Sequence, residues 1–325
     1  MNFNTKVEIL PFENKISHKS KIFLIGSCFS ENIAIKFENS KFNIKCNPFG
    51  VVYNPVSIFN CFEILKKQKI FTENDIFFEN GVWKSFEHHS SFSKVDKNET
   101  LQNINNDIIN ASSFLKKTAH VFITLGTSWI YEHIEKGFVV SNCHKVPSSN
   151  FNCKLLTVDE TFLSLQKIVE IIKEINNNVQ IIFTVSPIRH LKDGLHKNNV
   201  SKAILFAALN QLQNCNSEIY YFPAYEILID ELRDYRFYAD DMLHPSKMAI
   251  EYIWDVFYNT FFAQETIEII KKIEDIRIAM LHKPFFPKSK DYKTFKEKYY
   301  LTVCKLSEKY QFIDFNYEKD FFKNL

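Results

Sequence analysis

Short runs of consecutive apolar residues alternate along this chain with longer segments in which apolar residues recur every three or four positions. The short runs are typical of strands buried on both faces of a parallel sheet, and the longer segments are typical of helices that pack one face on a core. Strands are predicted over 21–25, 119–125, 179–185 and 219–222. Helices are predicted over 29–37, 55–65, 99–116, 157–172, 199–213, 224–233 and 246–257. This alternation predicts an α/β fold, a three-layer α/β/α sandwich around a mostly parallel sheet.

Two hairpins are predicted as insertions in this pattern. Residues 76–83 carry Asn80-Gly81 between two segments rich in apolar residues, and this dipeptide supplies the positive φ angles of a two-residue hairpin turn. A second hairpin is predicted over 130–141, turning near Lys136-Gly137, and a loop follows from 142 to about 154. Residues 5–20 are expected to form an edge strand or an irregular lead-in.

From about residue 262 the apolar spacing becomes wholly helical, and a proline-rich break at 283–287 separates two of the helices. We therefore expect an α/β domain over 1–261 and a C-terminal helical extension over 262–325 that packs on it.

Composition narrows the class of protein. Hydrophobic residues make up 46% of the 325, enough for a substantial core. The net charge is +2 and the lysines are scattered, so we expect neither nucleic acid nor an anionic membrane as a partner. Seven cysteines without a CxxC pair are typical of reduced thiols, and no apolar run approaches a membrane span. The amino terminus lacks a basic region followed by a long apolar one, so a cytoplasmic protein is expected.

The first candidate for chemistry is the turn after the first predicted strand, Gly26-Ser27-Cys28. A hydroxyl at a strand-to-helix turn lies at the carboxyl edge of the sheet, beside the N–H groups that begin a helix, which suits a nucleophile and its oxyanion hole. The alternative is that Gly26 only shapes the turn and Ser27 only caps the helix, and the two interpretations weigh equally on this stretch. The Cys28 thiol is a weaker nucleophile candidate, since it is expected to pack under the turn.

The second candidate is Asp241-x-x-His244, just before the last helix of the α/β pattern. A carboxylate three residues before a histidine can hold one tautomer while the other ring nitrogen accepts a proton from a nucleophile. A surface aspartate that caps a helix beside a solvent-exposed histidine is the alternative.

Taken in order, these motifs resemble the SGNH hydrolase superfamily and, more specifically, the GSCFA family. The stretches that carry the resemblance are Gly26–Ser30, Asn47–Val51, Thr124–Trp129, Asn142–Pro147, Thr184–His190 and Asp241–Ser246. The resemblance implies an SGNH-like sandwich with Ser27 as nucleophile, His244 as general base and Asp241 orienting His244. It also implies oxyanion donors at the backbone N–H groups of Ser27 and Gly50, with Thr127 or Ser128 where the superfamily usually has asparagine. This chain departs from the superfamily pattern by lacking both that asparagine and the aspartate that often precedes the nucleophile.

Several further residues are candidates for binding substrate. His89, His144 and Trp129 lie in or beside predicted insertions, and Arg189 follows the third predicted core strand, where it could hold an anionic group or form a structural ion pair. Three of the six glycines, at 26, 50 and 126, fall at one predicted edge, which is expected where backbone closely approaches a ligand or where strands simply turn into helices. The cysteine and histidine spacing matches no standard zinc site, so neither a metal nor another cofactor is predicted.

Two functions follow from these residues. The first is a serine ester hydrolase or O-acyltransferase that acts on an acylated substrate, with carbohydrate implied by the superfamily, through an acyl-enzyme on Ser27. The second is a non-catalytic module that binds a glycan or a protein on the same scaffold. The expected partner is a small-molecule or glycan ester, and the oligomeric state stays open.

Overall fold

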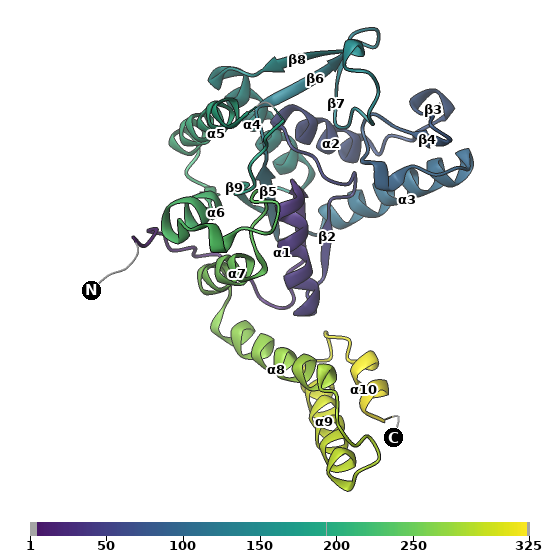
Figure 1. Cartoon of the computed structure of the whole chain (residues 1–325), viewed down its shortest axis with the longest axis vertical. Coiled ribbons are helices and arrows are strands. Elements are labelled where there is room, and N and C mark those ends of the chain that lie inside the picture. Colours follow the sequence, from purple (N-terminus) through teal and green to yellow (C-terminus); the bar gives the residue numbers. More distant parts are fainter. Residues whose placement is uncertain (1–4, 193, 324–325) are drawn as a thin grey trace.

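A five-stranded parallel sheet forms the centre of the computed structural model, which describes residues 5–192 and 194–323 (Figure 1). The strands are β1 (Ile22–Gly26), β2 (Ile44–Cys46), β5 (His120–Leu125), β9 (Gln180–Val185) and β10 (Ile219–Tyr221). They lie in the order β10-β9-β5-β1-β2, and every neighbouring pair is parallel. The predicted α/β class with a parallel sheet is confirmed, although the short strand β2 has too few apolar residues to have been predicted.

Helices cover both faces of the sheet, because side chains along each buried strand alternate between two cores. Phe23 and Ile25 of β1 join one core, and Ile22 and Leu24 join the other. The first core is covered by α2 (Pro55–Lys67), α3 (Lys97–Leu115), α4 (Val158–Ile175) and α5 (Leu195–Cys215). The second is covered by α1 (Cys28–Asn39), α7 (Lys247–Phe261) and the short α6 (Ala224–Glu226), which continues into a π-helical turn at Ile227–Leu232. The three-layer sandwich is thus confirmed.

The strand order changes direction between β1 and β5. The chain moves outward from β1 to β2 on one side, and from β5 through β9 to β10 on the other. In open α/β sheets ligands bind at such a switch point, outside the carboxyl ends of the strands. The β1–α1 turn therefore lies at the place in the fold most favourable for a site.

Outside the main sheet, the 76–83 hairpin is confirmed as β3 (Phe77–Glu79) and β4 (Val82–Lys84). The second hairpin is confirmed as β6 (Trp129–His133) and β7 (Phe138–Val140). The loop predicted over 142–154 is wrong in its last residues, because β8 (Phe151–Leu155) pairs with the other edge of β6. Three of its five side chains are exposed, so the segment has no apolar run by which a strand could be recognised.

The C-terminal segment is helical, as predicted, and comprises α8 (Gln264–Leu281), α9 (Lys290–Lys309) and α10 (Asn316–Lys323). Figure 1 shows α8 leading away from α7, with α9 and α10 beside its far end. These helices share a small core of their own around Ile273 and Val303, and an ion pair of 2.8 Å joins Lys41 to Glu318. None of the helices in the described part of the chain has the length and apolar character needed to cross a membrane.

Candidate active site

A thiol, an imidazole and a carboxylate lie in hydrogen-bonded order where the β1–α1 turn meets the loop before α7. The Cys28 Sγ lies 3.8 Å from Nε2 of His244, within reach for a sulfur hydrogen bond. Nδ1 of His244 lies 2.5 Å from Oδ2 of Asp241. The structure therefore brings Asp241 and His244 together, as the sequence predicts, but the side chain that faces the histidine is Cys28.

The loop that carries the histidine is braced locally. Oδ1 of Asp241 accepts hydrogen bonds of 2.9 Å from the backbone N–H groups of both Leu243 and His244. Met242, which follows Asp241, adopts a positive φ of 58°. These backbone bonds, followed by the bond from His244, lower the pKa of Asp241 to about 2. The carboxylate is therefore charged at neutral pH and accepts the proton on Nδ1, which leaves Nε2 to accept a proton from the thiol.

Ser27 lies next to this arrangement but outside it. Its side chain is 1% exposed and its Oγ accepts a hydrogen bond of 3.3 Å from the Phe29 N–H, so it caps α1. No hydrogen bond joins Ser27 to His244 within the described residues. The structure shows the alternative role of Ser27, a helix cap, while Ser27 as a nucleophile paired with His244 stays a prediction. A side chain at the capping position turns back over the helix N–H groups, whereas the next side chain projects past the helix end.

The predicted oxyanion donors are all engaged by the protein itself. The Ser27 N–H donates to the Thr124 carbonyl at 3.1 Å, and the Gly50 N–H donates to the Asn47 carbonyl at 2.7 Å. Both hydroxyls at the end of β5 instead contact Ser201 of α5, at 2.9 Å for Thr127 and 3.0 Å for Ser128. These groups are therefore bound to the protein's own atoms here, and their role as oxyanion donors stays a prediction.

One backbone N–H remains suited to that role. Cys28 is the first residue of α1, and no other residue in the described part of the chain accepts a hydrogen bond from its N–H. An N–H at a helix start points outward and carries the positive end of the helix dipole. Among the groups described, the Cys28 N–H is therefore the donor that the geometry offers to an oxyanion.

The three glycines at this edge approach the chain's own atoms. A Cβ at Gly26, where φ is 139°, would lie 2.2 Å from the Thr124 carbonyl oxygen, and a Cβ at Gly50 would lie 2.2 Å from Cβ of His89. A Cβ at Gly126 would meet Tyr53 at 3.1 Å. Of the two explanations offered for these glycines, close packing of the turns accounts for them, and closeness to a ligand is not needed.

The predicted substrate-binding residues of the insertions lie within packed structure. His144 is 5% exposed, its Nε2 pairs with the Ser85 carbonyl at 2.7 Å, and burial lowers its pKa. The His89 N–H donates to the Phe49 carbonyl at 2.8 Å, and its ring caps the following 3₁₀ turn. Trp129 begins β6 with its indole N–H buried and the Lys197 Nζ 5.7 Å from its ring centroid. No hydrogen bond joins any of the three to the Cys28–His244–Asp241 group within the described residues.

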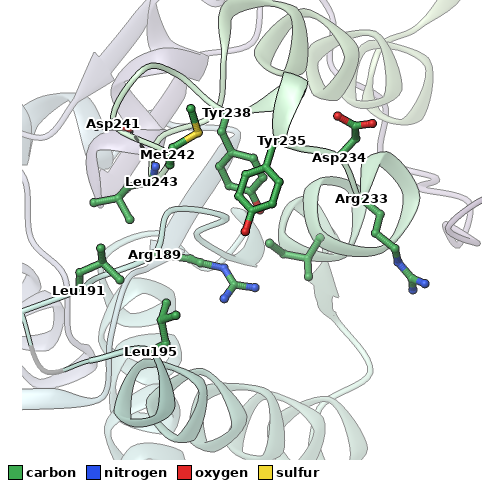
Figure 2. A pocket seen from close by; sticks show the side chains of 11 residues that line it. Arg189, Leu191, Leu195, Arg233, Asp234, Tyr235, Tyr238, Asp241, Met242 and Leu243 are labelled. Atoms are coloured by element: carbon green, nitrogen blue, oxygen red, sulfur yellow. Dashed lines mark hydrogen bonds between the residues drawn. The ribbon is translucent and has the colours of Figure 1, made fainter.

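Arg189 lines a cavity of about 370 Å³ that opens beside the histidine loop (Figure 2). Asp241, Met242 and Leu243 form one wall of this cavity. Leu191 and Leu195 form another, and Tyr235, Tyr238, Ile229, Arg233 and Asp234 complete the lining. Of the four candidate substrate-binding residues, His89, His144, Trp129 and Arg189, only Arg189 lines this cavity, which Asp241 also lines.

A buried lysine was missed by sequence reasoning. Lys202 of α5 is 2% exposed, and its Nζ donates to the Ser186 carbonyl at the end of β9 at 2.7 Å. Burial lowers its pKa to about 7. Burial and the charge of Glu31 raise the pKa of the Cys28 thiol, while Lys202 opposes that shift. At neutral pH the resting thiol is therefore protonated, and His244 has to remove its proton for the sulfur to react.

The structure is thus an α/β sandwich in which a thiol, an imidazole and a carboxylate lie in contact at the switch point of the sheet. The chain belongs to the GSCFA family: the model described as "GSCFA family" matches residues 21–257, and that described as "GSCFA domain protein, C-terminal domain" matches residues 273–325. The family resemblance drawn from the sequence motifs is thereby confirmed.

Three solved structures that resemble the chain are esterases or a lipase by description. A Clostridium thermocellum family 3 carbohydrate esterase shares 12% identity at a TM-score of 0.34, covering 78% of this chain and 97% of its own. A GDSL-like lipase from Bacteroides thetaiotaomicron shares 11% at 0.37, covering 76% and 90%. An acetyl xylan esterase from Butyrivibrio proteoclasticus shares 10% at 0.38, covering 76% and 64%. None of the curated proteins compared with the chain matches it.

Proposed function

We propose that this protein is an acyl hydrolase or acyltransferase that uses Cys28 as its nucleophile, with His244 as general base and Asp241 as the residue that orients it. The observation that carries the proposal is the continuous contact from the Cys28 Sγ through His244 to Asp241. Nucleophile and base commonly lie at longer distance before substrate binds, so 3.8 Å between sulfur and nitrogen suits a resting site.

The reaction proceeds in two halves. Nε2 of His244 takes the thiol proton as the Cys28 sulfur attacks the carbonyl carbon of an ester or thioester, giving a tetrahedral oxyanion. The oxyanion collapses, the bond to the leaving group breaks, and His244 returns the proton to that alcohol or thiol. The acyl group is now a thioester on Cys28. Water or an acceptor alcohol, deprotonated by His244, then attacks this thioester, and the thiol regains a proton as the acid or new ester departs.

Local electrostatics support this chemistry. The sulfur and the developing oxyanion lie at the amino-terminal end of α1, where the Cys28 N–H and the helix dipole favour negative charge. The charged carboxylate of Asp241 stabilises the imidazolium that forms when His244 holds the proton. An acylated carbohydrate, implied by the superfamily resemblance, stays the predicted substrate class within this proposal.

The test is to trap the acyl-enzyme. Purified protein is mixed with 4-nitrophenyl acetate and examined by intact mass spectrometry and peptide mapping. We expect one acetyl group on Cys28, removed by neutral hydroxylamine as thioesters are, and absent from Cys28→Ala and His244→Ala. Cys143 serves as the matched control, since it is also half-buried but has no contact with His244 among the described residues. Acetyl on Ser27 in the wild type would overturn the assignment.

A non-catalytic binding module is the second candidate, favoured by the engaged N–H groups of Ser27 and Gly50. A site with one free oxyanion donor would catalyse slowly. Failure of folded wild-type protein to acylate with both 4-nitrophenyl acetate and S-phenyl thioacetate would favour this candidate.

A further inference from the structure

The cavity beside the histidine loop carries several exposed large apolar side chains. Leu191, Leu195, Tyr235 and Met242 line it, and each of them keeps between 48% and 77% of its side chain exposed. Large apolar side chains gathered at one exposed hollow are typical of a ligand-binding surface. Figure 2 shows these side chains on opposite sides of the opening, so a ligand portion between them would be enclosed from both sides.

Among the described residues, three of the four charged side chains that line this cavity have a partner of opposite charge. Arg233 pairs with Asp230 at 3.6 Å, and Asp234 pairs with Arg236 at 2.8 Å. The carboxylate of Asp241 is bound by His244. Arg189 has no carboxylate partner among the residues that the structure describes. Its guanidinium lies near the middle of the cavity, below the hydroxyl end of Tyr235, in Figure 2.

A second basic side chain, Lys202, lies buried behind the cavity. Arg189 follows the carboxyl end of β9, and the buried Nζ of Lys202 is bound to Ser186 at that same strand end. Burial, with the charge of Arg189, lowers the pKa of Lys202 to about 7, so the Lys202 amine is only partly charged at neutral pH and Arg189 is the main cation at this strand end. The Arg189 guanidinium and the apolar side chains of the lining together favour a ligand that is anionic at one point and apolar elsewhere.

Resting on the proposed thiol chemistry, we propose that this cavity receives an apolar or aromatic portion of the substrate that carries a carboxylate, and that Arg189 binds this carboxylate. A single uncompensated guanidinium matches a single negative charge, and its planar fork matches the two oxygens of a carboxylate. The volume of about 370 Å³ suits a group of this kind. Asp241 and Leu243 form one wall, so a group bound in the cavity would lie against the loop that carries His244.

The test measures binding separately from turnover. 4-Phenylbutyrate and its neutral isostere 4-phenylbutanamide are titrated into the full chain by calorimetry, for the wild type, Arg189→Gln and Arg189→Lys. Arg277→Gln is the matched control, a half-exposed arginine of α8 paired with Glu274. We expect the wild type and the control to prefer the carboxylate. Arg189→Gln should lose about 10- to 100-fold in affinity for the carboxylate and nothing for the amide, with Arg189→Lys between them.

Equal affinity of the wild type for the carboxylate and the amide would overturn the inference, whatever the variants do. Ester hydrolysis then tests whether the carboxylate-bearing group belongs to the substrate. Arg189→Gln should reduce kcat/KM for 4-nitrophenyl hemiglutarate and leave kcat/KM for 4-nitrophenyl valerate unchanged. If the carboxylate binds through Arg189 but no ester is cleaved, the proposed function fails while the carboxylate site stands. If both esters are cleaved equally by wild type and Arg189→Gln, the function stands and the inference fails.

Discussion

Replacing Ser27 and Cys28 one at a time by alanine separates the helix cap from the nucleophile. The two residues are adjacent in the turn, yet one side chain points back to the Phe29 N–H and the other toward His244. Ser27→Ala removes the acceptor for one helix N–H, which costs about 1 kcal/mol of stability, or roughly 2 °C in Tm for a chain of this size. It leaves the sulfur and the imidazole in place, so we expect turnover within about tenfold of wild type.

Cys28→Ala has the opposite pattern. The fold keeps its cap and its cores, so Tm should stay close to the wild-type value, but no acyl intermediate can form. Loss of a nucleophile costs about 10⁴–10⁶ in kcat when histidine and nucleophile act as a unit. The assay is hydrolysis of 4-nitrophenyl acetate, with calorimetric melting on the same preparations. Ser27→Ala protein that is folded and inactive, beside Cys28→Ala protein that remains active, would refute the reasoning.

Three further predictions follow from single contacts. Asp241→Asn removes the charge that accepts the Nδ1 proton of His244, and we expect kcat for 4-nitrophenyl acetate to fall about 10²–10⁴-fold, with Cys28 still alkylated by iodoacetamide. Burial lowers the pKa of His88 to about 3, below the ordinary value of about 6.5, so the unfolded chain binds a proton that the folded chain does not. The free energy of unfolding should therefore fall as pH drops from about 6.5 toward 4, by up to about 1.4 kcal/mol per pH unit, and urea titrations should show a shallower fall in His88→Asn. Gly26→Ala would place a methyl group 2.2 Å from the Thr124 carbonyl oxygen, and we expect a loss of more than about 2 kcal/mol in urea unfolding, whereas Gly81→Ala, with open space around it, should lose less.

The arrangement of elements was predictable because it depends on local pattern. Four of the five strands of the main sheet are apolar runs, and the helix that begins at Val158 is preceded by the Thr157–Glu160 capping box seen in the structure. The Asn80-Gly81 turn predicts its hairpin for an equally local reason, the positive φ at both positions. Strands β2 and β8 were not predicted, because they are stabilised by pairing with β1 and β6, and their own residues carry no strand pattern.

The candidate site likewise combines a local contact, which the sequence predicts, with contacts between distant segments, which it does not. Asp241 and His244 are three residues apart, so their contact is local, and the sequence alone identified the pair. Which of Ser27 and Cys28 contacts His244 depends on the tertiary structure, because the contact joins the start of α1 to a loop more than two hundred residues later. The same holds for the engaged N–H groups of Ser27 and Gly50, and for the cavity that places Arg189 beside the triad. Each of these depends on contacts between distant segments, and a sequence pattern specifies the residues of such contacts without specifying their directions.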